Sequence, residues 1–247
     1  MTKTLALIPA HNEDATIGRI VRESLRHVGE VLVIDDGSSD RTAQEASDAG
    51  AVVVRIENNV GKGEALRRGF EVACAREPDV IVTLDADGEH EPDEIPNLLQ
   101  GLENADIVLG WRSRFRSSTR QALNGIAVWM FRLIDPSIKD TICGFRALRR
   151  EVVPLVTNPS PGFAFEHTFL LEALAHRVRM VSVPIRTEPT LTSHVRKRDI
   201  IETHNHFSQW VFQHRRRLEL PWWRRGILLM ACAIGLTMGR VVERFIA

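Results

Sequence analysis

Short apolar runs alternate with amphipathic segments over the first 110 positions of the chain. The apolar runs are TLALIP at 4–9, VLVID at 31–35, AVVVR at 51–55, VIVTLD at 80–85 and ADIVLG at 105–110. Their length, their β-branched residues and the turn residues that bound them predict buried β-strands. The segments between them at 15–28, 40–49 and 63–76 have helical periodicity. Because strand and helix alternate, we expect an α/β fold with a mostly parallel sheet and helices on both faces.

Beyond residue 110 the pattern is less regular. The sequence predicts helices at 119–134 and 163–176, a strand at 180–185 and a basic loop, SHVRKRD, at 193–199. With 247 residues the chain is long enough for one large domain and a tail. We place the domain at 1–205 and a basic, aromatic, helical tail at 206–247.

Charge is distributed unevenly, although the formal net charge is zero. Residues 1–110 carry about −12 and residues 111–247 carry about +12. A split of this size favours an acidic and a basic part with different functions over a chance distribution. The 3 cysteines are widely separated and form no CxxC pair, which argues against a disulfide framework and fits a reducing compartment.

Acidic clusters follow three of the predicted strands. PAHNE ends the first strand, DDGSSD ends the second, and DADGEH ends the strand at 80–85. In a parallel sheet these ends lie at the same edge, and ligands bind in the crevice beyond it. The clusters therefore predict one binding site instead of three unrelated turns.

Asp85 and Asp87 are two residues apart where their strand ends, so both carboxylates can reach one hard cation. Mg2+ usually takes one or two protein carboxylates and completes its shell with water and substrate phosphates. A lone D-x-D also occurs in solvated turns, and this alternative stays open for the motif by itself. Lys62 lies between two glycines, where it either neutralises a phosphate or simply belongs to the loop that enters a helix.

The motifs taken together resemble those of a known family. In chain order they are PAHNE, VIDDGSSD, GKGEAL and LDADGEH. Their order and spacing resemble the family-2 glycosyltransferases, which have a GT-A (Rossmann-like) fold. The later segments resemble the branch that glycosylates polyprenyl phosphates, including the dolichyl-phosphate mannose and glucose synthases; they are ADIVLGWRSR, DTICGFRALRREVV, GFAFE and SHVRKRD. The resemblance covers residues 4–200 and implies a nucleotide-sugar-binding half at 1–110 and an acceptor-binding half at 111–205.

Other families fit less well. DADG also resembles the first motif of haloacid-dehalogenase-type phosphatases, but Glu89 stands where they have Thr or Val, and DDGSSD precedes the motif instead of following it. The chain contains no QxxRW motif, which argues against a processive polysaccharide synthase. It also has no GxGTR-type loop near its start, which argues against a sugar nucleotidyltransferase.

The resemblance implies roles for individual residues in both halves. The donor would be bound by Pro9, His11, Glu13, Asp35, Asp36, Lys62, Asp85, Ala86 and Asp87. Mg2+ or Mn2+ would be held by Asp85, Asp87 and Glu89. The acceptor phosphate would be bound by Arg112, Arg116, Arg120, Arg146, His194, Arg196 and Arg198. The candidate catalytic residues are Asp87, Arg112, Arg120 and Arg146.

Several positions leave alternatives open. The family often has Gln at the position of Glu89, so this carboxylate either binds the ion directly or weakens diphosphate binding. The family commonly has Lys where His194 stands. His90 is expected to be an ordinary turn residue, and Glu166 either caps a predicted helix or orients an acceptor group.

The implied reaction is the inverting transfer of a hexose, mannose or glucose, from a nucleoside diphosphate sugar to a polyprenyl or dolichyl phosphate. A phosphate monoester is largely ionised near neutral pH, with a second pKa of about 6, so it needs nearby cations more than a strong base. Two alternatives stay open. One is a glycosyltransferase with another acceptor, such as a glycolipid or a polysaccharide; the other is a catalytically weak nucleotide-sugar-binding subunit that recruits a membrane partner.

The tail combines basic, aromatic and apolar residues. Between Arg225 and Arg240 lie 14 mostly apolar residues, fewer than the ~20 that span a bilayer. With the preceding PWW and HRRR sequences they predict a helix that lies on an anionic membrane surface. A span completed by a snorkelling Arg240, or a core or oligomer-interface helix, are the alternatives. We expect a location at the cytoplasmic face of a membrane, no nucleic acid partner, and a homo-oligomer or a small membrane subunit as a further partner.

Overall fold

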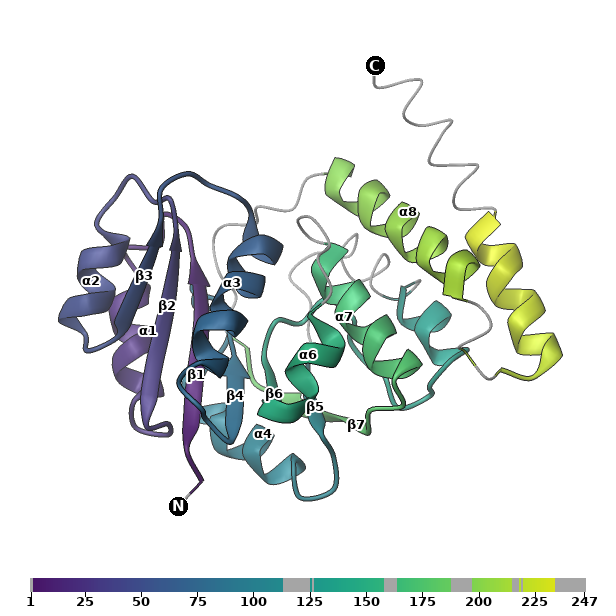
Figure 1. Cartoon of the computed structure of the whole chain (residues 1–247), viewed down its shortest axis with the longest axis horizontal. Helices are drawn as coiled ribbons and strands as arrows, with labels where there is room; N and C mark the ends of the chain where they lie inside the picture. The colour runs from purple at the N-terminus through teal and green to yellow at the C-terminus, as the bar shows by residue number, and fades with distance from the viewer. Residues whose placement is uncertain are drawn as a thin grey trace.

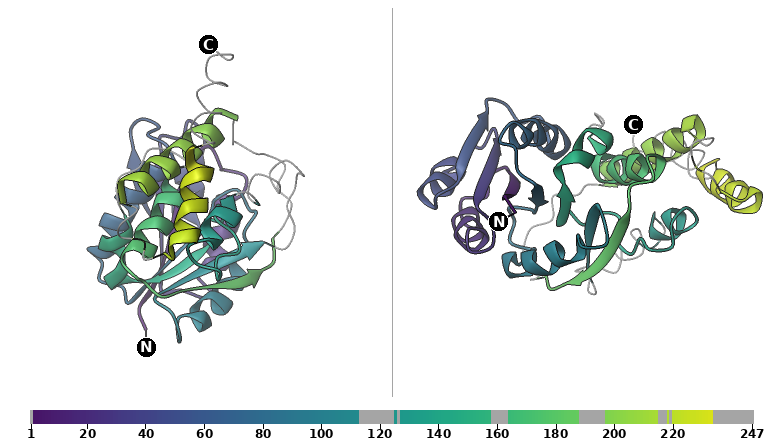
Figure 2. Two further views of the ribbon diagram at one scale, coloured as in Figure 1. Left: turned by 90° about the vertical axis from the view of Figure 1, so that its right-hand side faces the viewer. Right: turned by 60° about the horizontal axis from the view of Figure 1, so that its bottom comes forward.

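The computed structural model describes residues 2–112, 125, 127–157, 164–187, 197–214, 218 and 220–233. Within these residues seven strands form one sheet, which helices cover on both faces (Figures 1 and 2). The strands are β1 (Thr4–Ala10), β2 (Glu30–Asp36), β3 (Val52–Ile56), β4 (Val80–Thr83), β5 (Ile107–Arg112), β6 (Arg146–Arg149) and β7 (Met180–Ile185). The helices are α1 (Ile17–Ser24), α2 (Thr42–Asp48), α3 (Lys62–Cys74), α4 (Ile95–Gly101), α6 (Val153–Val156), α7 (Ala164–Ala175) and α8 (Lys197–His214), with short 3-10 helices η1 (Pro92–Glu94) and η2 (Arg150–Val152). Residues 127–132 and 222–233 are helical as well.

The strands are ordered β3-β2-β1-β4-β6-β5-β7. β6 is antiparallel to its neighbours β4 and β5, and the other paired strands are parallel. The predicted α/β fold with a mostly parallel sheet is therefore confirmed. After β1 the chain adds β2 and β3 on one side and then returns to place β4 on the other side. The point between β1 and β4 is thus a topological switch point, where open sheets of this kind bind ligands.

Each face of the sheet carries its own core. Along β1, Leu5 and Leu7 pack with residues of α3, α6, α7 and α8, whereas Ala6 and Ile8 pack with residues of α1, α2 and α4. Figure 2 shows helices on both sides of the strands. A strand that is buried on both faces needs apolar residues at every position, because successive side chains point to opposite faces. For this reason the strands stand in the sequence as unbroken apolar runs.

The second half of the chain agrees only partly with its sequence pattern. The helix predicted at 163–176 and the strand predicted at 180–185 are confirmed as α7 and β7. The helix predicted at 119–134 is present over 127–132, and residues 113–124 lie outside the described residues. The sequence does not indicate β6, because its four residues, RALR, include two arginines. It also does not indicate α4, which is only seven residues long and has a proline in its first turn.

β6 brings its amino end to the edge of the sheet where the parallel strands have their carboxyl ends. Arg146, the first residue of β6, is paired with Thr83 of β4 on one side and with Leu109 of β5 on the other. A side chain at the start of β6 therefore lies beside the residues that follow β4 and β5. This reversal places a basic residue of the second half at the edge where the acidic clusters of the first half end.

The C-terminal segments pack on the core that α7 and α8 share. Leu218, Leu220, Leu228 and Cys232 are all buried in this core. α8 runs across the boundary that we placed after residue 205, and the division of the chain into a domain and a tail remains a prediction. In the part of the chain that the structure describes, no helix is both long enough and apolar enough to cross a membrane. Residues 234–247 lie outside that part.

Candidate active site

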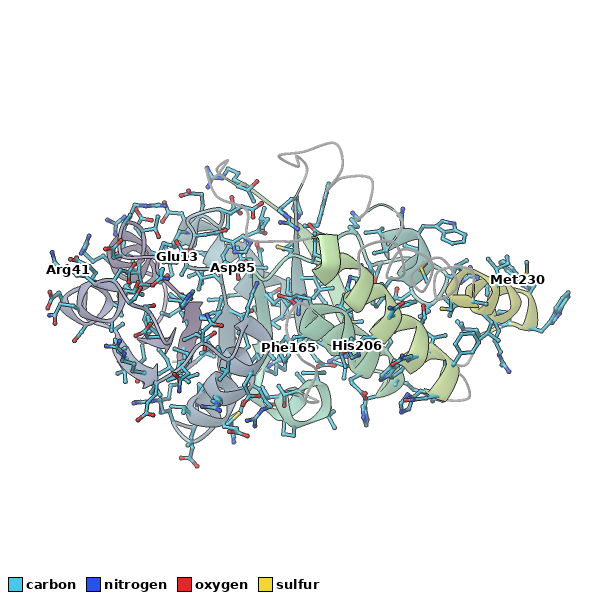
Figure 3. The ribbon with its side chains drawn as sticks, turned by 90° about the horizontal axis from the view of Figure 1, so that it is seen from above. Glu13, Arg41, Asp85, Phe165, His206 and Met230 are labelled. Carbon is cyan, nitrogen blue, oxygen red and sulfur yellow. The ribbon has the colours of Figure 1, made fainter. Side chains whose placement is uncertain are left out.

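Acidic side chains from three strand ends meet at the carboxyl edge of the sheet. They follow β1, β2 and β4, on both sides of the switch point. Figure 3 shows Glu13, which follows β1, and Asp85, which follows β4, in the same part of the molecule. Besides burial, the negative charges of Asp87 and Asp85 are close enough to Glu13 to raise its pKa. The structure thus brings the three sequence clusters together in one site.

Asp36 holds the loop that leads into α3. Its two carboxylate oxygens accept hydrogen bonds from the N–H groups of Val60, at 2.8 Å, and Gly61, at 2.9 Å. His11 Nδ1 donates a hydrogen bond to the backbone carbonyl of Asp36 at 2.8 Å. These bonds fix the side chain of His11 and the path of the chain around the end of β2, so both residues shape the site that was predicted to bind the donor.

Asp35 is buried beneath this loop. Its Oδ1 accepts a hydrogen bond from the N–H of Ser38 at 3.1 Å, whereas its Oδ2 accepts none within the described residues and lies 3.4 Å from Arg55 Nε. Pro9 lies opposite Ile34 in the neighbouring strand and is buried. Asp35 is thus held beneath the loop beside Arg55, and Pro9 contributes only shape.

Lys62, the first residue of α3, forms ion pairs with two carboxylates. Its Nζ lies 2.7 Å from Asp85 Oδ1 and 3.0 Å from Oε1 of Glu166, a buried residue in the first turn of α7. Burial opposes ionisation of Asp85, but Lys62 outweighs it and holds the pKa of Asp85 well below its usual range. Burial lowers the pKa of Lys62, but Asp85 and Glu166 outweigh it and raise that pKa. Glu166 thus has a partner that neither of its predicted roles included.

Asp87 and Glu13 lie where their ionisation is opposed. Burial, followed by the charge of Asp85, raises the pKa of Asp87. Burial, followed by the charge of Asp87, raises the pKa of Glu13 to about 7. Asp87 Oδ1 also accepts a hydrogen bond from the N–H of Glu89 at 3.0 Å, which fixes the turn after β4. Carboxylates with raised pKa values of this origin become stable anions when a cation binds beside them.

The carboxylates after β4 fit a hard divalent cation. Asp85 and Asp87 would supply the oxygen ligands, and the pKa of Asp87, raised by burial and by the charge of Asp85, shows a site where an added cation would favour the anion. The described residues contain no group of three or more His, Cys, Asp or Glu side chains arranged to hold a metal ion. Two carboxylates suffice for Mg2+ where phosphate and water complete its shell. Glu89 Oε1 accepts a hydrogen bond from Arg112 Nη1 at 3.1 Å, and its role as a third ligand stays a prediction.

His90 lies fully buried behind Asp85, so the prediction of an ordinary turn residue is wrong. Its Nδ1 accepts a hydrogen bond from the backbone N–H of Asp85 at 3.1 Å, and its Nε2 lies 3.6 Å from Cys143 Sγ. Burial lowers the pKa of His90, which agrees with a neutral ring whose Nδ1 is an acceptor. His90 therefore fixes the backbone from which the Asp85 carboxylate extends.

Arg112, the last residue of β5, is buried between carboxylates. Its Nε and Nη2 donate hydrogen bonds to the two oxygens of Asp140 at 2.9 Å and 3.2 Å. Its Nη1 donates to Glu89, as described above. The bidentate pair with Asp140 fixes the plane of the guanidinium group. Arg112 thus lies at the edge where it was predicted, with its positive charge shared between two carboxylates.

Arg146 lies in the same buried network. Its Nε donates a hydrogen bond to the carbonyl of Cys143 at 3.0 Å, and its guanidinium carbon lies 4.7 Å from the ring centre of Phe169 in α7. Burial lowers the pKa of Arg146, and the negative charges of Glu166 and Asp85 partly oppose this shift. Arg146 is therefore close to the carboxylates that Lys62 joins, on the side of the second half of the chain.

Several of the predicted phosphate-binding residues cannot be placed in this network. Arg116, Arg120, His194 and Arg196 lie outside the described residues. Arg198 belongs to α8, but its side chain also lies outside them. Their roles stay predictions.

The sequence matches a family model across this site. The model for glycosyl transferase family 2 matches residues 6–156, which include the three acidic clusters, Arg112 and Arg146. The matched stretch is more than half of the chain. The chain belongs to glycosyl transferase family 2.

Several relatives of this family 2 protein have names that refer to polyprenyl phosphates. Polyprenol monophosphomannose synthase of Mycolicibacterium smegmatis is 30% identical over 208 residues, which cover 74% of this chain and 76% of that protein. Undecaprenyl-phosphate mannosyltransferase of Micrococcus luteus is 29% identical over 202 residues, which cover 74% and 82%. Dolichol-phosphate mannosyltransferase of Pyrococcus furiosus is 33% identical over 200 residues, which cover 74% of this chain and 55% of that protein.

Solved structures share the fold of the family 2 chain. Glucosyl-3-phosphoglycerate synthase from Mycobacterium tuberculosis, crystallised with Mn2+, uridine diphosphate and glucosyl-3-phosphoglycerate, has a TM-score of 0.70 and 23% identity, with 89% of this chain and 81% of that chain covered. The same protein crystallised with Mg2+ and uridine diphosphate has a TM-score of 0.69. At this identity the similarity concerns the fold, and it agrees with the predicted GT-A class.

Some residues of the family 2 site carry no clear signal in the sequence. Thr16 Oγ1 donates a hydrogen bond to the carbonyl of Ala86 at 2.6 Å and so connects the residue before α1 to the turn after β4. The N–H of Asn12, a residue with φ of 56°, donates to Ser38 Oγ at 2.9 Å and joins the first two acidic clusters. Asn12 and Asp140 stand inside the motifs PAHNE and DTICGFRALRREVV, although no role was predicted for either, whereas Thr16 lies outside every motif. Their partners are distant in sequence, so only the folded structure reveals them.

Gly144 leaves the space that the Asp85 carboxylate occupies. A Cβ at this position would lie 2.7 Å from Asp85 Oδ1 and 3.0 Å from Oδ2, so the carboxylate would have to move. We expect Gly144→Ala to weaken Mn2+ binding about 10–100-fold, as seen when groups that support metal ligands are changed. The measurement is titration with Mn2+ followed by electron paramagnetic resonance of the free ion. Gly125→Ala is the control, because a Cβ there meets nothing within 4 Å; equal affinities of the two variants would contradict the prediction.

The pKa of Glu13 predicts a pH-dependent stability of the metal-free protein. This pKa rises from an ordinary value of 4.5 to about 7 in the folded state, so the folded state binds more protons between these values. Stability therefore falls as the pH rises from 4.5 to about 7 and is then constant with respect to this group. In EDTA we expect the Tm of Glu13→Gln, relative to the wild type, to increase over this range and then level off. A Tm difference that is constant, or that grows toward acid pH, would show that Glu13 has no raised pKa.

Proposed function

We propose that the protein is an inverting hexosyltransferase that moves mannose or glucose from a nucleoside diphosphate sugar to a polyprenyl phosphate. The observation that carries this proposal is the meeting, at one sheet edge, of acidic side chains from the first half and buried arginines from the second. Transfer between two anionic substrates needs both: carboxylates for a metal ion at the diphosphate and cations for the acceptor phosphate. The relatives named for undecaprenyl, polyprenol and dolichol phosphates support the choice of acceptor.

The donor would lie along the switch point between β1 and β4. Asp35, at the end of β2, would lie at the base and ribose of the donor, and His11 and Glu13 would line the side that β1 provides. Asp85 and Asp87 would hold Mg2+ or Mn2+, the ions that accompany uridine diphosphate in the crystal structures with a similar fold. A bound divalent ion supplies positive charge that stabilises the leaving diphosphate.

The acceptor phosphate would approach from the side of the second half. A phosphate oxygen attacks the anomeric carbon opposite the diphosphate, so the bond to the nucleoside diphosphate breaks and the configuration inverts. Because the phosphate monoester is already ionised, the chain needs to supply positive charge and orientation. Arg146 and Arg112 provide planar guanidinium groups that suit phosphate oxygens. Arg116, Arg120, Arg196 and Arg198, with His194, remain predicted contributors.

A transfer assay tests the proposal directly. Radiolabelled sugars are offered from a panel of uridine and guanosine diphosphate sugars to a short polyprenyl phosphate, with Mg2+, Mn2+ or EDTA. We expect a chloroform-extractable product that forms from one donor and requires the metal. Donor binding without an extractable product would overturn the assigned acceptor and favour another acceptor or a sugar-nucleotide-binding subunit.

Asp87→Asn tests the metal site without disturbing the fold. Loss of one charged oxygen ligand should lower turnover at least about 100-fold, a typical effect of removing one group that stabilises transition-state charge. The circular dichroism spectrum should be unchanged. Asp93→Asn is a control in the same segment, because the side chain of Asp93 is 61% exposed. Undiminished turnover in Asp87→Asn would contradict the assignment of Asp87 to the metal.

The proposal includes a location on a membrane surface, at the cytoplasmic face. The helix at 222–233 presents an exposed apolar face to solvent; its large side chains are Trp222, Trp223, Ile227 and Met230. Trp222 is 85% and Met230 is 67% exposed, while Leu228 and Cys232 of the same helix are buried. Figure 3 shows Met230 at the opposite end of the molecule from Glu13. A helix that is anchored by one side and apolar on the other suits the interface of a bilayer, from which the lipid acceptor comes.

Acidic substitutions on this exposed apolar face should weaken vesicle binding. We expect the variant with Trp222→Glu and Met230→Glu to sediment with vesicles of phosphatidylcholine and phosphatidylglycerol at least about tenfold more weakly than the wild type, because two apolar side chains no longer enter the interface. Leu155→Glu is the control, since Leu155 of α6 is an apolar residue with 39% exposure on another surface. Equal sedimentation of the wild type and the double variant would overturn the membrane location.

A further inference from the structure

Lys62 contacts one of the two carboxylate oxygens that Asp85 could offer to a metal ion. The distance of 2.7 Å from Lys62 Nζ to Asp85 Oδ1 is that of a charge-assisted hydrogen bond. The same oxygen cannot accept this bond and at the same time coordinate a metal with the same lone pair. An ammonium group this close would also repel a divalent cation, since the repulsion between charges rises as their distance falls. Lys62 and a metal ion therefore compete for Asp85.

Glu166 offers Lys62 a second position. Its Oε1 lies 3.0 Å from Lys62 Nζ. Its Oε2 is buried and accepts no hydrogen bond within the described residues. A buried carboxylate oxygen without a partner is costly, and a second bond from the ammonium group would satisfy it. Lys62 can thus leave Asp85 without leaving the site, because its contact with Glu166 Oε1 holds the ammonium group there.

The contact of Lys62 with Glu166 also joins the two halves of the chain. Lys62 begins α3 of the first half, and Glu166 lies in the first turn of α7 of the second half. The rings of Phe70 and Phe165, in the same two helices, stack with their centres 6.4 Å apart. The polar contact is therefore supported by an apolar one, and the position of the ammonium group depends on where α7 lies.

We propose that Lys62 is a displaceable counter-ion of Asp85, and that Glu166 is the positioning residue that retains it. The inference rests on the proposed function, because it requires a donor that binds with a metal ion. In the donor-free protein the ammonium group neutralises Asp85. When metal and diphosphate bind, it leaves Asp85, stays bound to Glu166 and faces the diphosphate. Removal of Lys62 should therefore strengthen the binding of metal alone and weaken the binding of nucleotide with metal.

Titrations of the full chain test the two directions. For Mn2+ alone, we expect the Kd of Lys62→Met to be about tenfold lower than that of the wild type, because a competing cation is gone. For uridine or guanosine diphosphate at saturating Mn2+, we expect a Kd at least about tenfold higher than that of the wild type. Lys3→Met is the matched control, because it removes the same charge from an exposed position just before β1, at the opposite edge of the sheet.

Glu166→Gln tests whether Glu166 acts through Lys62. In this variant Lys62 pairs with Asp85 alone, so we expect Mn2+ to bind at least about threefold more weakly than in the wild type. In the background of Lys62→Met the same substitution should have less than half of this effect on the logarithm of the Kd. A general loss of negative charge would act equally in both backgrounds, so this non-additivity isolates the pair. If Lys62→Met does not fold, the double variant replaces it and should bind Mn2+ more tightly than Glu166→Gln.

The outcomes separate this inference from the proposed function. Equal Mn2+ affinity of Lys62→Met and the wild type, with nucleotide binding intact in the wild type, overturns the counter-ion role and leaves the proposed donor site standing. Additive effects of the two substitutions overturn the role of Glu166. If neither the wild type nor Lys62→Met binds Mn2+, the metal site fails, and the counter-ion role falls with it. Absence of lipid-linked product in the transfer assay bears on the acceptor and does not change these titrations.

Discussion

The mutual repulsion of carboxylates at one edge of the sheet is the constraint on which the site depends. Parallel strands deliver the ends of β1, β2 and β4 to this edge, so Glu13, Asp85 and Asp87 lie close together. Two unit charges about 4 Å apart repel by about 4 kcal/mol at an effective dielectric constant near 20, a large part of the 5–15 kcal/mol that stabilises a typical domain. The fold accommodates this in two ways. Lys62 neutralises Asp85, while burial and the neighbouring negative charges raise the pKa of Glu13 to about 7 and raise the pKa of Asp87 above its usual value.

The reversed strand β6 lets the basic half reach this acidic edge. In an all-parallel arrangement, the start of a strand lies at the edge opposite the strand ends. Because β6 runs antiparallel between β4 and β5, its first residue, Arg146, lies at the acidic edge. Arg112 reaches the same edge by ending β5. Two arginines of the basic half therefore meet the acidic clusters of the first half at one edge of the sheet.

The sequence predicts those features of the fold that depend on local pattern. Strands buried on both faces give apolar runs, and acidic residues after them indicate the edge where they meet. β6 is missed because two of its four residues are arginines, whose place in the sheet depends on pairing with β4 and β5. The pairing of Lys62 with Glu166 and the burial of His90 behind Asp85 are missed for a related reason. In each case the folded chain brings the two residues together, and the sequence around one of them does not indicate the other.

Asp36 shows the same limit for a residue that the sequence did single out. The resemblance indicates a contact with the donor, while the structure shows both of its carboxylate oxygens holding the N–H groups of Val60 and Gly61. These two residues immediately precede Lys62, so Asp36 fixes the start of α3 and with it the backbone that carries the ammonium group. An acidic residue of the second cluster thus acts on the third cluster through the loop between them. The electrostatic balance at Asp85 is therefore set by the end of β2 as well as by the residues that touch it.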